Sequence, residues 1–243
     1  MAKKVIISFD VERDCPPYLD SAKGVLYGLP RLLELLREEG IRATFFTTGF
    51  IAERYPSIIK RVVDEGHELG CHGYRHERLD KLGADDARRV VEKATMILRR
   101  FSDYVVSFRA PNLQLPEPYI RILIENGYYA DSSLALYKPP FRKGIEVYAE
   151  GLVRVPASIT SSMLRLPWRL QRLIHGRLPS PVVYFSHPWE YIDMRKERVR
   201  FDCRFGTGVA ALDKLRKVIR FHRERGAVFL TMKEYADQVL GLA

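Results

Sequence analysis

The chain alternates short apolar runs with longer stretches in which apolar residues recur at helical spacing. Residues 5–9 (VIISF) form a continuous β-branched and aromatic run that is typical of a buried strand. Residues 85–101 carry an apolar stripe at helical spacing, with arginines on the other faces. The same patterns predict further strands at 43–47, 68–71, 105–108, 128–130, 181–185 and 227–231, and further helices at 30–39, 56–65, 118–125, 209–222 and 233–240.

This order of strands and helices predicts an α/β fold in which outer helices cover parallel strands. About seven strands in one chain favour a distorted (β/α)7-type barrel over an open sheet. Residues 146–155 are expected to form paired or sequential extended segments around Gly151. No internal repeat, low-complexity tract or linker divides the sequence, so residues 1–243 are expected to form one domain.

The charge of the chain is strongly basic but is spread along the sequence. The 40 Lys and Arg residues outnumber the 30 Asp and Glu residues, which gives a net charge of +10. Basic and acidic residues are mixed, and no arginine-rich or RNA-binding aromatic motif is present. A solvated surface is therefore expected, with no nucleic-acid partner.

The cysteines and the amino terminus favour a reducing compartment. Cys15, Cys71 and Cys203 are far apart and form no C-x-x-C pair, so no disulfide framework is expected. The apolar run before Asp10 is too short for the core of a signal peptide. No run approaches the roughly 20 apolar residues of a membrane span. The sequence as given is expected to be cytoplasmic.

Three of the six histidines lie in the stretch HELGCHGYRHERL at residues 67–79. His72 and His76 are four residues apart, which would place both imidazoles on one face of a helix or helical turn. Residues 68–71 resemble a strand end, and ligand sites of α/β folds gather there. Both histidines could also be ordinary surface or core residues. A catalytic zinc usually takes three protein ligands, so this pair needs a third.

Other polar side chains of catalytic type follow the remaining predicted strands. These residues are Asp10, Glu12, Arg109, Asp131 and His187. Each has an ordinary alternative as a cap, a surface ion-pair partner, a turn residue or a structural histidine. In a barrel the carboxyl ends of all strands meet on one face, so together these residues predict a single site.

The complete set resembles the polysaccharide deacetylases of carbohydrate esterase family 4, which share the NodB homology domain. The resemblance extends from the first strand to about Thr231. It rests on SFDVE at 8–12, HGYRH at 72–76, RAP at 109–111 and FSH at 185–187. The family implies a distorted barrel, a divalent ion for which zinc is expected, and hydrolysis of the N-acetyl group of a carbohydrate.

The resemblance implies an acid–base pair. Asp10 would be the general base, and Arg109 would hold it. His187 would be the general acid, and Asp131 would orient it. The products would be acetate and a free amine, and Phe185 would form the wall of a slot for the acetyl methyl group.

The resemblance also implies a metal site in which Glu12 joins the two histidines. The second carboxylate of the family's first motif is replaced by Val11, and Glu12 fits a D-x-E variant of that motif. Side chains alternate along a strand end, so Asp10 and Glu12 would share one side while Val11 packs on the other. Asp14 competes for the same role, but the two prolines at 16 and 17 indicate that the chain has turned away by that point.

The substrate contacts depart from the family's pattern. The aromatic residue and glycine expected after R-x-P are Asn112 and Leu113 here, and the groove tryptophan expected a few residues after Asp131 is missing. The predicted substrate contacts are Phe185, Trp189 and Pro111, with Trp189 in place of the missing tryptophan. Three alternatives stay open: a hydrolase of cyclic amides, an inactive carbohydrate-binding member and a basic nucleic-acid binder.

The segment at 162–177 (SMLRLPWRLQRLIHGR) is both basic and amphipathic. Such a segment can lie on an anionic lipid surface, which would suit a lipid-linked substrate. Most amphipathic segments instead pack on a core, and Pro167 weakens a continuous helix. The sequence therefore favours an ordinary helix or loop with a solvated basic face.

Overall fold

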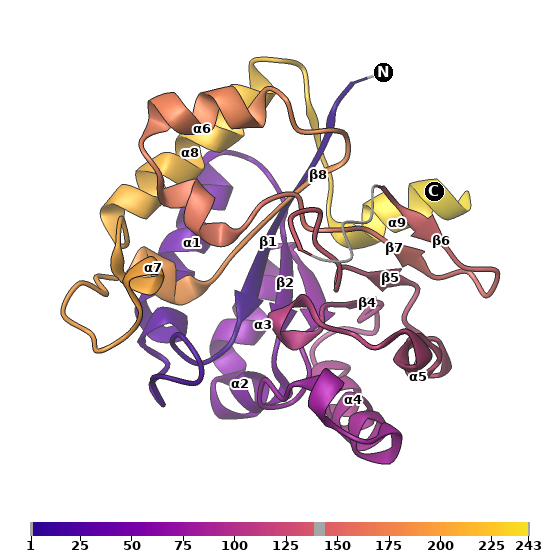
Figure 1. Ribbon diagram of the computed structural model, residues 1–243. Coiled ribbons are helices and arrows are strands. Elements are labelled where there is room, and N and C mark those ends of the chain that lie inside the picture. Colours follow the sequence, from indigo (N-terminus) through magenta and orange to yellow (C-terminus); the bar gives the residue numbers. More distant parts are fainter. Residues whose placement is uncertain (1, 139–143, 243) are drawn as a thin grey trace.

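A computed structural model describes residues 2–138 and 144–242, and in these residues the strands form one nine-stranded sheet (Figure 1). The strand order is β6-β7-β5-β4-β3-β2-β1-β8, with β9 also pairing with β1. The strands are β1 (Lys4–Val11), β2 (Thr44–Thr47), β3 (Glu68–Cys71), β4 (Ser107–Phe108), β5 (Ala130–Asp131), β6 (Glu146–Val147), β7 (Val153–Arg154), β8 (Val182–Ser186) and β9 (Val228–Phe229).

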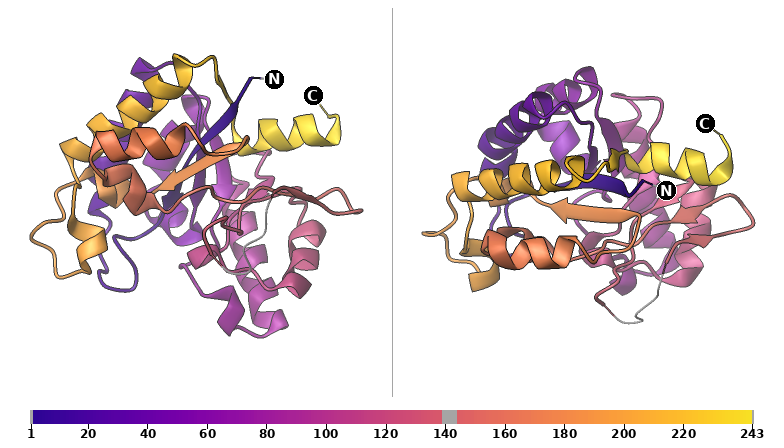
Figure 2. Two further views of the ribbon diagram at one scale, coloured as in Figure 1. Left: turned by 45° about the horizontal axis from the view of Figure 1, so that its top comes forward. Right: turned by 90° about the horizontal axis from the view of Figure 1, so that it is seen from above.

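Helices follow most of the strands, as the alternating pattern predicted. The α-helices are α1 (Leu29–Glu38), α2 (Gly49–Arg54), α3 (Pro56–Asp64), α4 (Ala84–Leu98), α5 (Ile120–Glu125), α6 (Trp168–His175), α7 (Phe201–Arg204), α8 (Val209–Arg223) and α9 (Met232–Leu240). The short turns that bear on the site are η1 (Gly24–Gly28), η3 (Pro111–Leu113), η5 (Ser161–Arg165) and η6 (Pro188–Tyr191). Figures 1 and 2 show the helices on the outside of the curled sheet, with α1, α6 and α8 together on one side.

The sheet curls into a distorted parallel barrel, which confirms the predicted fold class. All strand pairs are parallel except β6 and β7, whose antiparallel hairpin accounts for the extended segments predicted around Gly151. Just beyond β7, the backbone amide of Ser158 donates to the carbonyl of Val183 on β8 at 2.9 Å. This contact joins the two ends of the curled sheet and narrows the opening between them.

Alternation along β1 determines which side chains reach the interior of the barrel. One set belongs to the large core shared with the outer helices: Val5, Ile7, Phe9 and Val11. Ile6 faces the other way and packs with Phe46 and Val183. Because strand side chains alternate, the same parity carries Asp10 and Glu12 to the inner side at the carboxyl end of β1.

The basic segment at 162–177 divides into η5 and α6. Leu164 is buried, and Trp168 and Ile174 pack against the main core. Leu170 and Leu173 are 52% and 57% exposed. Core packing therefore accounts for much of the apolar character of this segment. None of the helices in the described residues combines the length and the apolar character that crossing a bilayer needs.

Tyr184 on β8 lies between two buried histidines of the outer helices. Its hydroxyl oxygen is 2.8 Å from His175 Nδ1 and 2.8 Å from His222 Nε2. His175 Nε2 lies 3.1 Å from the side-chain amide oxygen of Gln171, which can only accept, so Nε2 carries the proton and Nδ1 accepts from the tyrosine. His222 then donates to the tyrosine oxygen. Burial lowers the pKa of His175 to about 4 and that of His222 to about 3.

We expect the free energy of unfolding to fall as the pH is lowered from 7 to 5. In the unfolded chain these histidines take up protons near pH 6.5, whereas in the fold they stay neutral to about pH 4. The neutral, buried state of these histidines therefore contributes fully to the free energy of unfolding above pH 6.5. This contribution is lost as the pH falls, by about 2 kcal/mol per histidine at pH 5. Urea unfolding at both pH values should show a smaller loss in His222→Gln than in the wild type. An equal loss in both proteins would contradict this role.

Candidate active site

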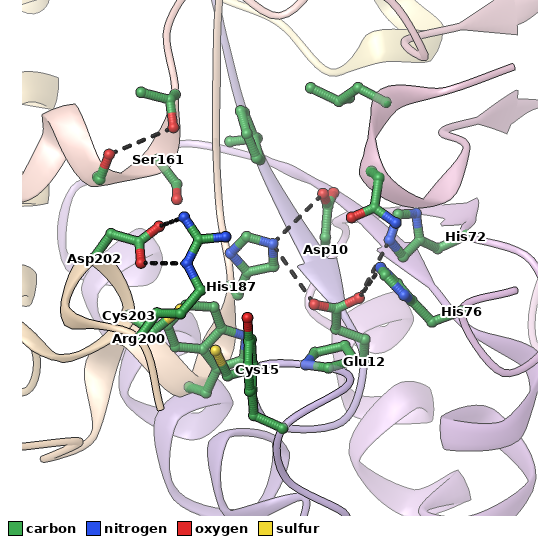
Figure 3. Close-up of a pocket in the computed structure, with 18 of the residues that line it drawn as sticks. Asp10, Glu12, Cys15, His72, His76, Ser161, His187, Arg200, Asp202 and Cys203 are labelled. Atoms are coloured by element: carbon green, nitrogen blue, oxygen red, sulfur yellow. Dashed lines mark hydrogen bonds and ion pairs between the residues drawn. The ribbon is translucent and has the colours of Figure 1, made fainter. Parts of the chain in front are cut away.

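Arg109, which follows β4, lies fully buried beneath the carboxyl end of β1. Its Nη1 atom is 2.7 Å from Asp10 Oδ1 and 2.9 Å from the hydroxyl of Ser8. Its Nη2 atom donates to the hydroxyl of Ser132 at 2.9 Å. These bonds fix one carboxylate oxygen of Asp10 and leave Oδ2 directed toward His187 (Figure 3).

Glu12, His72 and His76 bring three donor atoms together beside Asp10. Glu12 Oε2 is 3.4 Å from His72 Nε2 and 2.9 Å from His76 Nε2. His72 Nδ1 is 2.7 Å from the carbonyl oxygen of Arg109, which requires a proton on Nδ1 and leaves the Nε2 lone pair facing Glu12. Burial raises the pKa of Glu12. The positive charge of His76 and the contacts with both histidines outweigh this effect, so the pKa of Glu12 lies below its usual range.

The donors of this trio fit a divalent cation. Ligand atoms of all three residues lie within 4.8 Å of one another. His72 Nε2 is buried and has no hydrogen-bond partner among the described residues, which is costly unless an ion or water satisfies it. One carboxylate and two imidazoles are a donor set that zinc accepts in catalytic sites. Asp14 turns away, because its carboxylate accepts hydrogen bonds from the Ser21 hydroxyl and the Lys23 and Gly24 amides.

The two histidines converge through a bent loop, so the expectation of a helical turn is wrong. No helix spans residues 72–76, and Gly73 and His76 have φ angles of +73° and +71°. The carbonyls of Gly73 and Tyr74 accept from the amides of Gly49 and Phe50 at 2.9 Å, which fixes the loop on the start of α2. A left-handed conformation is costly for a histidine, and such strain is typical of functional sites.

His187 follows β8 and borders the trio. Its Nε2 atom is 3.7 Å from Glu12 Oε1 and 4.0 Å from Asp10 Oδ2. Its Nδ1 atom is 2.8 Å from Glu190 Oε1, and Arg165 Nε lies 2.7 Å from the other oxygen of Glu190. Burial lowers the pKa of His187. The hydrogen bond to Glu190 and the nearby carboxylates outweigh this effect and raise the pKa of His187 to about 9.

Asp131 does not orient His187, so this expectation is corrected. Its carboxylate pairs with Arg154 Nε at 2.8 Å and accepts from the amide and hydroxyl of Ser133. The Ser133 hydroxyl in turn accepts from the Ala110 amide at 2.8 Å. Asp131 therefore supports the chain next to Arg109, while Glu190 occupies the position beside the histidine.

A cleft of about 250 Å³ lies over these groups (Figure 3). Phe185 and Trp189 line it, and the ring centroids of Trp189 and His187 are stacked 4.9 Å apart. Pro111 is not among the lining residues, and its neighbours Asn112 and Leu113 take its place. The remaining lining residues are Asp10, Glu12, Cys15, Pro16, Tyr18, His72, His76, Tyr137, Lys138, Thr160, Ser161, Ser162, Arg165, His187, Arg200, Asp202 and Cys203.

The turn that carries Trp189 is held by a close approach of η1. A Cβ atom on Gly28 would lie 2.0 Å from the Pro188 carbonyl oxygen, and one on Gly24 would lie 2.4 Å from the Trp189 amide nitrogen. Only glycine fits at such distances. The loop after β1 and the turn after β8 are therefore packed as one support for His187.

A family model described as polysaccharide deacetylase matches residues 2–130, which is more than half of the chain. The chain belongs to the polysaccharide deacetylase family. The match covers the segments that carry Asp10, Glu12, the two histidines and Arg109.

Relatives with curated names include peptidoglycan deacetylases and chitooligosaccharide deacetylases. A peptidoglycan-N-acetylglucosamine deacetylase of Bacillus cereus is 38% identical over 94 residues, covering 39% of this chain and 32% of the relative. A peptidoglycan deacetylase of Helicobacter pylori is 27% identical over 151 residues, covering 55% of this chain and 51% of the relative. The matches thus span between about a third and a half of these relatives.

Solved structures share the fold of this polysaccharide deacetylase family member across nearly its whole length. A candidate polysaccharide deacetylase of Mycobacterium smegmatis has a TM-score of 0.76 at 22% identity, and covers 100% of this chain and 92% of its own. A family 4 carbohydrate esterase of Streptomyces lividans, solved with acetate, has a TM-score of 0.63 at 17% identity, with 93% and 91% covered. Because the sequence identities are this low, the comparison with these structures shows only that the barrel fold is shared.

Glu190 and Arg165 are site residues that the sequence prediction missed. Glu190 lies three residues after His187, and its carboxylate also accepts from the His187 amide at 3.0 Å. This is the spacing of a capping box, in which a residue before a turn and a glutamate three positions later bond each other. That spacing is a signal available in the sequence, whereas the reach of Arg165 from a separate segment is not.

We expect Glu12→Gln to weaken the affinity for zinc by at least about tenfold, because it removes the negative charge that Glu12 would bring to the ion. Asp14→Asn should leave the affinity within about threefold, a difference below about 1 kcal/mol, because Asp14 is engaged by the loop. Competition with a chromophoric chelator measures both affinities, with circular dichroism to verify folding. The opposite order of effects would show that the ligand assignment is wrong.

Proposed function

We propose that this protein is a divalent-metal-dependent hydrolase that removes N-acetyl groups from an N-acetylated sugar or glycan. The observation that carries the proposal is the meeting of Asp10 and His187 around the trio of Glu12, His72 and His76. Membership of the polysaccharide deacetylase family supports the same reaction class. The proposed product pair is acetate and the free amine.

Amide hydrolysis needs help at both ends of the bond, because the carbonyl carbon is a poor electrophile and the amine is a poor leaving group. A zinc ion held by Glu12, His72 and His76 would supply Lewis acidity that polarises a carbonyl and lowers the pKa of water. Asp10 would accept the proton of the attacking water. Arg109, paired with Asp10 at 2.7 Å, would keep that carboxylate ionised and oriented.

His187 would complete the reaction as the general acid. Its Nδ1 proton is directed at Glu190, which leaves Nε2 to present a second proton to the cleft. As the carbon–nitrogen bond breaks, that proton would move to the departing nitrogen. The proton that Asp10 takes from water balances the proton that His187 gives up. Overall, the hydroxyl group of water goes to the acetyl carbon and its other proton goes to the amine. The ion pair of Glu190 with Arg165 supports the orientation of His187.

The walls of the cleft support a substrate that is part apolar and part hydroxylated. Phe185 and Leu113 belong to an apolar cluster with Ala135 and Ala157, which would receive the acetyl methyl group. The hydroxylated lining residues Thr160, Ser161 and Ser162 lie elsewhere on the wall. Hydroxyl groups can both donate to and accept from sugar hydroxyls. This combination suits an N-acetylated carbohydrate.

Two variants test the acid–base assignment. His187→Ala should keep bound zinc but reduce acetate release from N-acetylchitooligosaccharides by roughly 10²–10⁴-fold, the range for loss of a general acid or base. Asp10→Asn should behave in the same way. Zinc content by elemental analysis and acetate release by a coupled assay give the two readouts. Asp85→Asn, which changes an exposed aspartate on α4, is the control.

Wild-type turnover in either variant would remove that residue from the mechanism. Loss of zinc together with activity would instead make the residue part of the metal site. Absence of acetate release from every N-acetylated glycan offered to the zinc-loaded wild type would refute the proposed function.

A further inference from the structure

Lys138 is a half-buried cation on the cleft wall. Its ammonium group donates to the carbonyl oxygen of Asn112 at 3.0 Å, and no described carboxylate forms an ion pair with it. The residues that follow, 139–143, contain no Asp or Glu in the sequence. Burial and the nearby charge of Arg78 lower the pKa of Lys138.

The two arginines that line the same cleft are already neutralised. Arg165 pairs with Glu190 at 2.7 Å. Arg200 makes two contacts of 3.0 Å with the carboxylate of Asp202. Among the lysines and arginines of the described cleft wall, Lys138 is therefore the one without a counter-ion. A partly desolvated ammonium group without a counter-ion contributes favourable binding free energy when a ligand supplies one.

We propose that Lys138 binds a carboxylate carried by the substrate, so that the preferred substrate is an acidic N-acetylated glycan. This inference rests on the proposed function, because it requires the glycan to occupy the cleft. One ammonium group balances the single charge of a carboxylate. A phosphate dianion would leave charge unbalanced near Asp10 and Glu12, and it favours the forked donors of arginine.

The position of Lys138 suits a contact beyond the reacting acetamide. Tyr137, the preceding residue, packs on the apolar cluster that contains Phe185 and Leu113. A sugar with its acetyl methyl in that cluster would direct neighbouring substituents along the wall toward Lys138. The lysine also has a second possible role, because it bonds the carbonyl of Asn112, whose φ angle is +59°. The experiment must separate ligand binding from support of this turn.

Two glycans that differ in charge alone distinguish binding of the substrate carboxylate from support of the Asn112 turn. The acidic probe is a peptidoglycan tetrasaccharide in which alternate N-acetyl sugars carry a lactyl carboxylate. The matched neutral probe is the same tetrasaccharide with its carboxyl groups reduced to alcohols. Calorimetry in the presence of EDTA, which prevents turnover, gives the Kd of each probe for the wild type, Lys138→Met and Lys138→Arg. Lys217→Met, an exposed change on α8, is the control.

We expect the wild type and Lys217→Met to bind the acidic probe at least about tenfold more tightly than the neutral probe, as a charge-assisted hydrogen bond would provide. Lys138→Met should lose this preference and bind the neutral probe within about twofold of the wild type. Lys138→Arg should keep part of the preference.

Equal wild-type affinity for the two probes would overturn the proposal. Equal weakening of both probes by Lys138→Met would also overturn it, because the lysine would then act by supporting the Asn112 turn. Acetate release by the zinc-loaded wild type is measured separately. A Lys138-dependent preference without acetate release would retain the carboxylate site and reject the proposed function.

Discussion

The buried contact between Arg109 and Asp10 is the interaction on which the rest of the site depends. The guanidinium reaches from the end of β4 across the barrel to the end of β1, and its own carbonyl fixes the ring of His72. One residue thus holds the proposed base and sets the tautomer of a proposed metal ligand. A buried charge that loses its partner costs about 3–5 kcal/mol, so this pair links the stability of the barrel to the geometry of the site.

Other arginines of this basic chain pair with buried acids. Arg154 pairs with Asp131, and Arg165 pairs with Glu190. The buried carboxylate of Glu39 on the outer side is contacted by three arginines of α8, namely Arg216, Arg220 and Arg223. Part of the positive charge therefore balances internal carboxylates, which argues against a continuous surface for nucleic acid. Lys138 differs from these arginines, because no described carboxylate forms an ion pair with it.

The sequence predicted the features that follow from strand parity and strand ends. Parity along β1 predicted that Asp10 and Glu12 share one side and that Val11 packs on the other, outside the site. In the structure both carboxylates approach His187, and Val11 belongs to the main core. The loop of His72 and His76 was not predictable from spacing, because the convergence depends on left-handed φ angles at Gly73 and His76. Asp131 was misassigned because a strand end gives a position but no partner. Its partner is Arg154, from a strand later in the chain.

The central claim is that Glu12, His72 and His76 hold a divalent ion between the proposed base and acid. The most direct measurement is the anomalous difference density of a zinc-loaded crystal, recorded on both sides of the zinc absorption edge. The account predicts one strong peak in contact with Glu12, His72 and His76, at ligand distances of about 2.0–2.2 Å. A peak in contact with Asp14 instead of Glu12, or no peak at this position at full zinc loading, would contradict it.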